Sequence, residues 1–76
     1  MPRNSVAHFF AQGDLVYLPA KTHLTRYDNQ GVANEFCFLP TPKNVVFHRG
    51  LLNQGKVEIL YEGEIWCVQE ESCFMP

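Results

Sequence analysis

Apolar residues in this chain occur in short runs that are separated by glycine, proline, asparagine or aspartate. A run of this kind that is rich in β-branched and aromatic residues is typical of a β-strand. An amphipathic helix would instead repeat its apolar residues every three or four positions over ten or more residues. The pattern therefore predicts a mainly β protein, with helical spacing confined to the N-terminus.

The clearest strand pair lies between residues 57 and 68, where the sequence reads VEILYEGEIWCV. Glu62 and Gly63 at its centre suit the two-residue loop of a tight β-hairpin, although asparagine or aspartate is commoner than glutamate at the first loop position. This loop predicts one mostly apolar face that belongs to the core. The core residues of that face are Val57, Ile59, Tyr61, Trp66 and Val68. A three-residue loop would mix polar and apolar residues on both faces, so the two-residue loop is preferred.

The same register leaves the other face of the hairpin mixed in character. Leu60 lies opposite Ile65 on that face, and Glu58 lies opposite Cys67. Because Trp66 falls on the core face, we expect it to support the fold rather than to contact a ligand.

Four further segments have the residue types and the boundaries of strands. They are Leu15–Leu18, Thr22–Tyr27, Glu35–Leu39 and Val45–Arg49. Residues 28–31, Asp-Asn-Gln-Gly, predict a turn because these residues accept positive φ. Residues 50–55 predict a turn-rich connection that contains Leu51 and Leu52.

Residues 1–12 precede the first predicted strand and form an N-terminal arm or a short helix. Ser5 would cap a helical turn that places Phe9 and Phe10 on one face. In the alternative, the segment is irregular, and the two phenylalanines plug one end of the fold. Both structures remain open at this point.

The order of these segments resembles that of the SH3-like barrel. The resemblance spans residues 13–74 and rests on the opening GDLVYLP, the tight hairpin that ends in IWCV, and the following QEES and CF. In that family, such a hairpin is followed by one 3₁₀ turn and a closing strand. The resemblance implies a small barrel of about five strands over residues 13–76, with residues 1–12 as an appendage.

The first motif differs from that of the eukaryotic SH3 domains that bind proline-rich peptides. GDLVYLP contains one aromatic residue, Tyr17, and residues 19–34 are not acidic as the corresponding loop of those domains is. The chain is more similar to small bacterial SH3-like proteins, which are often encoded on phage or other mobile elements. The resemblance therefore does not imply a proline-rich ligand.

Length and composition fit one small folded domain. The 76 residues are 46% hydrophobic and 18% charged, which is too apolar for a disordered tail. A core of this size stabilises a chain only marginally, so pairing with a second copy would add useful stability. No apolar stretch approaches the roughly 20 residues that cross a membrane, and residues 1–12 lack the pattern of a signal peptide. We expect a cytoplasmic protein without membrane contact.

The formal net charge of −2 is unevenly distributed along the chain. Residues 1–56 contain all six basic residues and three acidic ones, a net charge of +3. Residues 57–76 contain five glutamates and no basic residue, a net charge of −5. This asymmetry would orient a basic partner or a head-to-tail contact between copies, whereas the simpler interpretation is a set of solvated carboxylates.

The residues that could carry chemistry form no recognisable motif. The three histidines and three cysteines show neither metal-ligand nor Cys-x-x-Cys spacing; they are His8, His23, His48, Cys37, Cys67 and Cys73. We expect reduced thiols, no metal, no cofactor and no catalytic activity. A bridge between Cys67 and Cys73 would require their Cα atoms to lie within about 7 Å.

We therefore expect a non-catalytic protein-interaction module that binds a protein partner or, as a homodimer, a second copy of itself. The chain contains more large apolar residues than one small barrel core needs. The candidate interaction surface is Leu60, Ile65, Leu51, Leu52, Tyr17 and Tyr27.

Weak binding of single-stranded nucleic acid is the alternative, because small β-barrels do this with basic and aromatic surface residues. The candidates are Lys21, Arg26, Lys43, Arg49, Tyr17, Tyr27, Phe38 and Phe47. The acidic net charge and a sequence pI near 5.8 disfavour this function.

Overall fold

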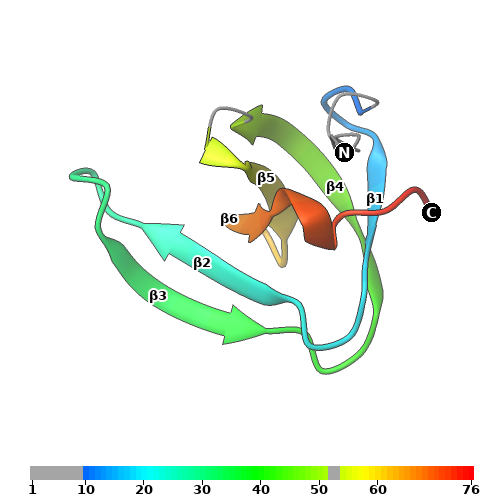
Figure 1. Cartoon of the computed structure of the whole chain (residues 1–76), viewed down its shortest axis with the longest axis horizontal. Coiled ribbons are helices and arrows are strands. Elements are labelled where there is room, and N and C mark those ends of the chain that lie inside the picture. The colour runs from blue at the N-terminus through cyan, green and yellow to red at the C-terminus, as the bar shows by residue number, and fades with distance from the viewer. Residues whose placement is uncertain (1–9, 52–53) are drawn as a thin grey trace, which may run out of the picture.

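A computed structural model describes residues 10–51 and 54–76, which form one antiparallel β-sheet of six strands (Figure 1). The strands are β1 (Leu15–Leu18), β2 (His23–Tyr27), β3 (Ala33–Phe38), β4 (Lys43–Leu51), β5 (Lys56–Tyr61) and β6 (Glu64–Gln69), followed by the 3₁₀ helix η3 (Glu70–Ser72). Their order across the sheet is β1-β4-β5-β6-β2-β3. The mainly β prediction is confirmed. Within the described residues, no helix is long and apolar enough to span a membrane.

The predicted strand segments are all present, and β1 has the predicted boundaries. Two details were wrong. The sheet has six strands, one for each predicted segment, instead of the about five that the resemblance implies. Gly50 and Leu51 belong to β4 and not to the connection after it, since they pair with Val57 and Lys56. The arm or helix predicted over residues 1–12 lies mostly outside the described residues, as does Leu52.

The β2–β3 hairpin projects from the rest of the sheet in Figure 1, and Asp28 organises its turn. The Asp28 Oδ1 atom accepts hydrogen bonds from the backbone N–H groups of Gln30 and Val32, both at 2.9 Å. Gly31 adopts a φ of 80°, which favours glycine. The turn predicted over residues 28–31 is therefore confirmed.

The β5–β6 hairpin has the predicted register. Ile59 lies opposite Trp66, and Leu60 lies opposite Ile65. The two loop residues, Glu62 and Gly63, have φ values of 52° and 80°. Positive φ at both positions is the signature of a type I′ turn, whose twist matches that of the strands.

The core lies on one face of the sheet. Its fully or nearly buried members are Val16, Leu18, Leu24, Leu39, Val45, Phe47, Val57, Ile59, Val68 and Cys73. Tyr61 and Trp66, which the sequence placed on the core face, are partly buried against this cluster. Phe10 stacks on Phe47 with the two ring centroids 5.5 Å apart. The core face of the hairpin is thus as predicted.

The C-terminal segment returns to the first strand. After η3, the Tyr17 N–H donates to the Phe74 carbonyl at 2.9 Å, and the Phe74 N–H donates to the Tyr17 carbonyl at 3.0 Å. The 3₁₀ turn expected at QEES is present as η3, whereas the closing strand expected at CF is only an isolated bridge at Phe74. This bridge covers the side of β1 that faces away from β4.

The turn at Glu62 and Gly63 gives the first testable prediction. Gly63→Ala should lower the free energy of unfolding by about 1 to 2 kcal/mol, because a side chain disfavours left-handed backbone even where a Cβ meets no neighbour. Glu62→Asn should raise it by roughly 0.5 kcal/mol, because asparagine suits this position better. Urea unfolding measures both, and effects of the same sign would contradict the assigned turn.

Two neighbouring residues test the assignment of the two faces. Ile59 is 0% exposed and Leu60 is 40% exposed. Ile59→Ala should therefore lower the free energy of unfolding by about 2 to 5 kcal/mol, through lost burial and the cavity left behind. Leu60→Ala, the matched control, should change it by less than about 1 kcal/mol. Equal losses in guanidinium unfolding would show that the register is wrong.

Candidate functional site

A row of aliphatic side chains crosses four adjacent strands on the face opposite the core. Leu15 of β1 lies opposite Val46 of β4, Val46 opposite Leu60 of β5, and Leu60 opposite Ile65 of β6. Leu15, Leu60 and Ile65 are 51%, 40% and 37% exposed, and Val46 is half-buried. Successive residues of a strand point to opposite faces, so each member of the row has a core-facing neighbour. We call these four residues the outer row.

A groove of about 620 Å³ adjoins the outer row. It is lined by residues of β2, β5 and β6, by the tip of the β2–β3 hairpin and by the ends of β4 and β5. Ile65 belongs to both the groove and the outer row. Tyr27 and Leu51 supply further apolar lining, and Thr25 and Cys67 contribute where β2 pairs with β6.

The positive charges beside this groove already have partners. The Lys56 Nζ donates to the Tyr27 hydroxyl at 2.6 Å and lies 4.5 Å from the centroid of the Tyr27 ring. Arg26 forms ion pairs with Glu35 and Glu64, and its guanidinium lies 5.4 Å from the centroid of Trp66. These contacts are intramolecular and fix the walls of the groove. Two carboxylates neutralise Arg26, whereas the phenol and the ring of Tyr27 hold Lys56 without supplying a negative charge.

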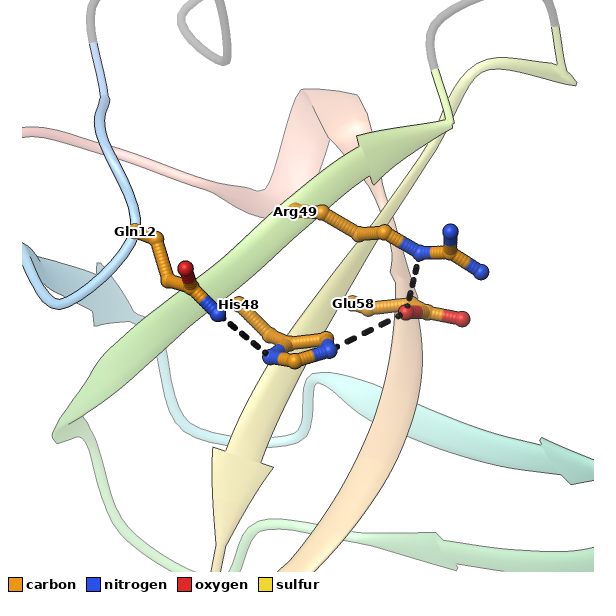
Figure 2. Close-up of polar contacts among 4 residues, drawn as sticks. All are labelled: Gln12, His48, Arg49 and Glu58. Carbon is orange, nitrogen blue, oxygen red and sulfur yellow. Dashed lines mark hydrogen bonds and ion pairs between the residues drawn. The ribbon is translucent and has the colours of Figure 1, made fainter.

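A polar cluster of Gln12, His48, Arg49 and Glu58 connects the segment before β1 with β4 and β5 (Figure 2). The Arg49 Nε donates to the Glu58 Oε1 at 2.7 Å, and the His48 Nε2 lies 3.9 Å from the same oxygen. The His48 Nδ1 is 3.4 Å from the Gln12 side-chain amide. An irregularity in the β4–β5 register between Phe47 and Arg49 accompanies this arrangement and lets consecutive side chains reach Glu58.

The pKa values near this cluster follow from its contacts. The hydrogen bond and the charge of Glu58 raise the pKa of Arg49, which stays protonated. Within residues 10–51 and 54–76, the structure places an amide and a carboxylate against His48. Neither is the thiol or hydroxyl that a histidine base activates in covalent catalysis.

The three cysteines are free thiols with raised pKa values. Burial is the main cause for each, and it raises the pKa of Cys73 to about 12. Negative charge adds to the effect, from Glu62 and Glu35 at Cys37 and from Glu58 at Cys67. Since the thiolate is the reactive form, these thiols are weak nucleophiles. In the described part of the chain, no three His, Cys, Asp or Glu side chains are placed to hold a metal ion.

The structure brings together four of the six residues that the sequence proposed for an interaction surface. Leu60 and Ile65 pair directly, and Ile65, Leu51 and Tyr27 line the groove. Tyr17 lies on β1, where it pairs with Asn44 and Phe74 outside this groove. Leu52 is outside the described residues.

Sequence reasoning missed Leu15 and Val46 as surface residues of the outer row. The available signal was their alternation with core positions, because Leu15 precedes Val16 and Val46 lies between Val45 and Phe47. The pairing of β1 with β4 joins residues about thirty positions apart. Because no short turn connects these two strands, the sequence pattern does not predict that they pair.

Among the residues proposed for nucleic-acid contact, Phe47 was wrongly placed at the surface. It is 5% exposed and belongs to the core, since its side chain faces inward from β4. Arg26 and Arg49 are engaged by glutamates. Tyr27 and Phe38 remain exposed aromatic residues, at 38% and 57%.

Comparisons with protein-family models, with curated proteins and with solved structures give no match to this chain. The candidate site consists of the outer row, the groove at one end of it and the polar cluster.

The burial of the thiols predicts an order of reactivity. Cys37 and Cys67 are half-buried and Cys73 is fully buried, so iodoacetamide at pH 8 should label Cys73 at least tenfold more slowly than the other two. Peptide mass spectrometry over a time course measures this order, with the unfolded chain in guanidinium as a control in which all three react alike. Equally fast labelling of Cys73 in the folded protein would contradict the packing.

Proposed function

We propose that this chain is a non-catalytic protein-interaction module that associates with a second copy of itself through the outer row. The observation that supports this proposal is the continuous line of Leu15, Val46, Leu60 and Ile65 on the face opposite the core. Single exposed aliphatic residues are ordinary on protein surfaces, whereas contiguous apolar patches mark interaction sites.

The fold that we propose for this module is an SH3-like barrel. Its support is the order of elements: β1, the long β2–β3 hairpin, the β4–β5–β6 meander, η3, and a last segment beside β1. Two contacts connect separate parts of this order. Thr25 of β2 pairs with Cys67 of β6, and Tyr17 of β1 pairs with Phe74.

The charge distribution favours a second copy as the occupant of the outer row. In a two-fold arrangement, the β1 and β4 half of one row would cover the β5 and β6 half of the other. The first half belongs to residues 1–56, with a net charge of +3, and most of the second to residues 57–76, with a net charge of −5. Segments of opposite net charge would then meet across the interface.

The size of the outer row predicts a weak dimer. Four partly exposed aliphatic side chains provide much less than the roughly 800 Å² per partner of a standard interface. The polar cluster of Gln12, His48, Arg49 and Glu58 borders the row and would form part of the rim. Dimerisation should therefore depend on concentration in the micromolar range or above.

The alternative function, weak binding of single-stranded nucleic acid, has less support. Arg26 and Arg49 are paired with glutamates, and Phe47 is buried. Retention on an immobilised oligonucleotide that falls steeply with salt concentration would favour this alternative, since phosphate contacts release counterions.

Charged substitutions in the outer row test the proposed dimer. Leu60→Asp and Ile65→Asp should each raise the dimer dissociation constant at least tenfold, because the interface would bury an unpaired carboxylate. Light scattering coupled to size-exclusion chromatography over a concentration series measures the mass. Met75→Asp is the matched control, because Met75 is 62% exposed and outside the row.

The oligomeric state of the unmodified protein tests the proposal as a whole. A mass that stays monomeric up to about 1 mM would overturn self-association through any surface, since weaker pairing has no stable interface. Circular dichroism of the two aspartate variants should remain that of the folded sheet, because both positions face solvent.

A further inference from the structure

The two edges of the sheet are protected to different degrees. The β1 edge is covered by the bridge between Tyr17 and Phe74. The other edge is β3, and no strand in the described part of the chain pairs with its outer side. Exposed edges are usually blocked by lysine, proline or a bulge. The β3 sequence, ANEFCF, contains neither lysine nor proline, and its only charged residue, Glu35, is paired with Arg26. The register irregularity in β3 lies at Asn34, near the tip of the hairpin, and the pairing with β2 is regular from Glu35 to Phe38.

Two phenylalanines are the most prominent feature of this edge. Phe36 is 71% exposed and Phe38 is 57% exposed. Both lie on the face opposite the core, because Cys37 between them packs against the core cluster. The β2 side of the hairpin covers them only in part, with Thr25 opposite Phe36 and His23 opposite Phe38. The edge therefore presents aromatic surface that its own sheet leaves open.

The hydrogen-bonding groups of the same two residues point away from the sheet. The Leu39 N–H donates to the Thr22 carbonyl at 3.0 Å, so Leu39 directs its backbone groups toward the β2 side. This direction alternates along an antiparallel strand. Cys37 and Glu35 therefore also face β2, whereas Phe36 and Phe38 direct their N–H and C=O groups outward. The outward groups and the exposed rings belong to the same residues.

We infer that β3 pairs antiparallel with β3 of a second copy, about a two-fold axis at Cys37. Phe36 of each copy then lies opposite Phe38 of the other, and the two sheets become one. This inference rests on the proposed self-association, and it adds an edge contact that is separate from the outer row. The Phe36 and Phe38 pairs form the outward hydrogen bonds of the two strands.

This register is favoured over registers shifted by one or two residues because of the cross-strand residue pairs that it forms. An axis at Glu35 would set the two Glu35 side chains against each other, and like charges directly opposite are destabilising. An axis at Phe36 would pair Asn34 with Phe38. The axis at Cys37 pairs aromatic residues at both hydrogen-bonded positions, which is the most favourable of the cross-strand combinations.

Charge complementarity supports a second copy as the partner strand. Antiparallel pairing places the tip of one hairpin beside the base of the other. Asp28 lies at the tip, and Lys43 begins β4 at the base, whereas Glu35 is already paired with Arg26. Acidic and basic ends would therefore meet twice in the pair.

The area available predicts a dimer that depends on concentration. A phenylalanine contributes about 150 to 250 Å² when buried, so the four partly exposed rings offer roughly 500 Å² of aromatic surface. Together with the paired backbone, this is at the low end of specific interfaces. The edge contact is therefore expected at high protein concentration.

A disulfide between the native Cys37 residues of two copies would report the inferred contact. In the inferred register, the two Cys37 residues face each other at a non-hydrogen-bonded position, where Cα atoms are about 4.5 Å apart and a disulfide fits. The full chain with Cys67→Ser is oxidised with copper phenanthroline over a concentration series. We expect a dimer joined through Cys37, identified by peptide mass spectrometry, whose yield rises with concentration.

Matched variants separate this contact from the outer row. Phe36→Lys should lower the yield of the Cys37 dimer at least tenfold, and Phe38→Lys serves as a second variant should the first fail to fold. Met75→Lys is the control at an exposed site outside the edge, and it should leave the yield unchanged. Leu60→Asp should also preserve the Cys37 dimer, because Leu60 is not on β3.

Three outcomes would overturn the inference. The first is absence of the Cys37 dimer, and the second is its persistence in both lysine variants. The third is loss of the Cys37 dimer in Leu60→Asp alone. In that case the outer row would carry self-association, and the proposed function would stand. Phe36→Cys in a Cys37→Ser background tests the register. If that variant cross-links better than Cys37, the axis lies at Phe36 and the inferred register is wrong.

Discussion

The type I′ turn at Glu62 and Gly63 determines the register of β5 and β6, and hence the face that each side chain of that hairpin occupies. A shift of one residue would exchange Ile59, which is fully buried, with Leu60, which is partly exposed. The hairpin lies at the centre of the sheet order, so β4 and β2 pair with strands whose faces are already decided. The turn therefore decides which side chains of this hairpin enter the core and which, Leu60 and Ile65, join the outer row.

A single sheet of this length buries one face and leaves the other in water. The core face takes the valines, isoleucine and leucines of the central strands, together with the thiol of Cys73. On the other face, charged side chains satisfy one another, as Arg49 does with Glu58, and aliphatic residues remain exposed between them. A surface with paired charges, weakly acidic thiols and a continuous apolar row is suited to contact with another protein. This is the physical basis of the proposed interaction module.

The two edges of the sheet, β1 and β3, also differ from each other. The C-terminal segment after η3 satisfies the backbone of Tyr17 on β1. The β3 edge has two exposed phenylalanines and outward backbone groups, with Asp28 holding the turn that presents it. In the inferred pairing, β3 of a second copy covers this edge.

The sequence by itself determined the elements whose causes are local. The turn residues at Glu62-Gly63 and at 28–31, and the alternation within the β5–β6 hairpin, predicted strands, turns and one register correctly, because these depend on backbone preferences of adjacent residues. Only the tertiary structure decided which distant strands are neighbours. The pairing of Leu15 with Val46 creates the outer row, and the pairing of β2 with β6 leaves β3 at the edge. The burial of Phe47 and the pairing of Arg26 could likewise not be predicted from the sequence, because both depend on contacts between segments that are not adjacent in the chain.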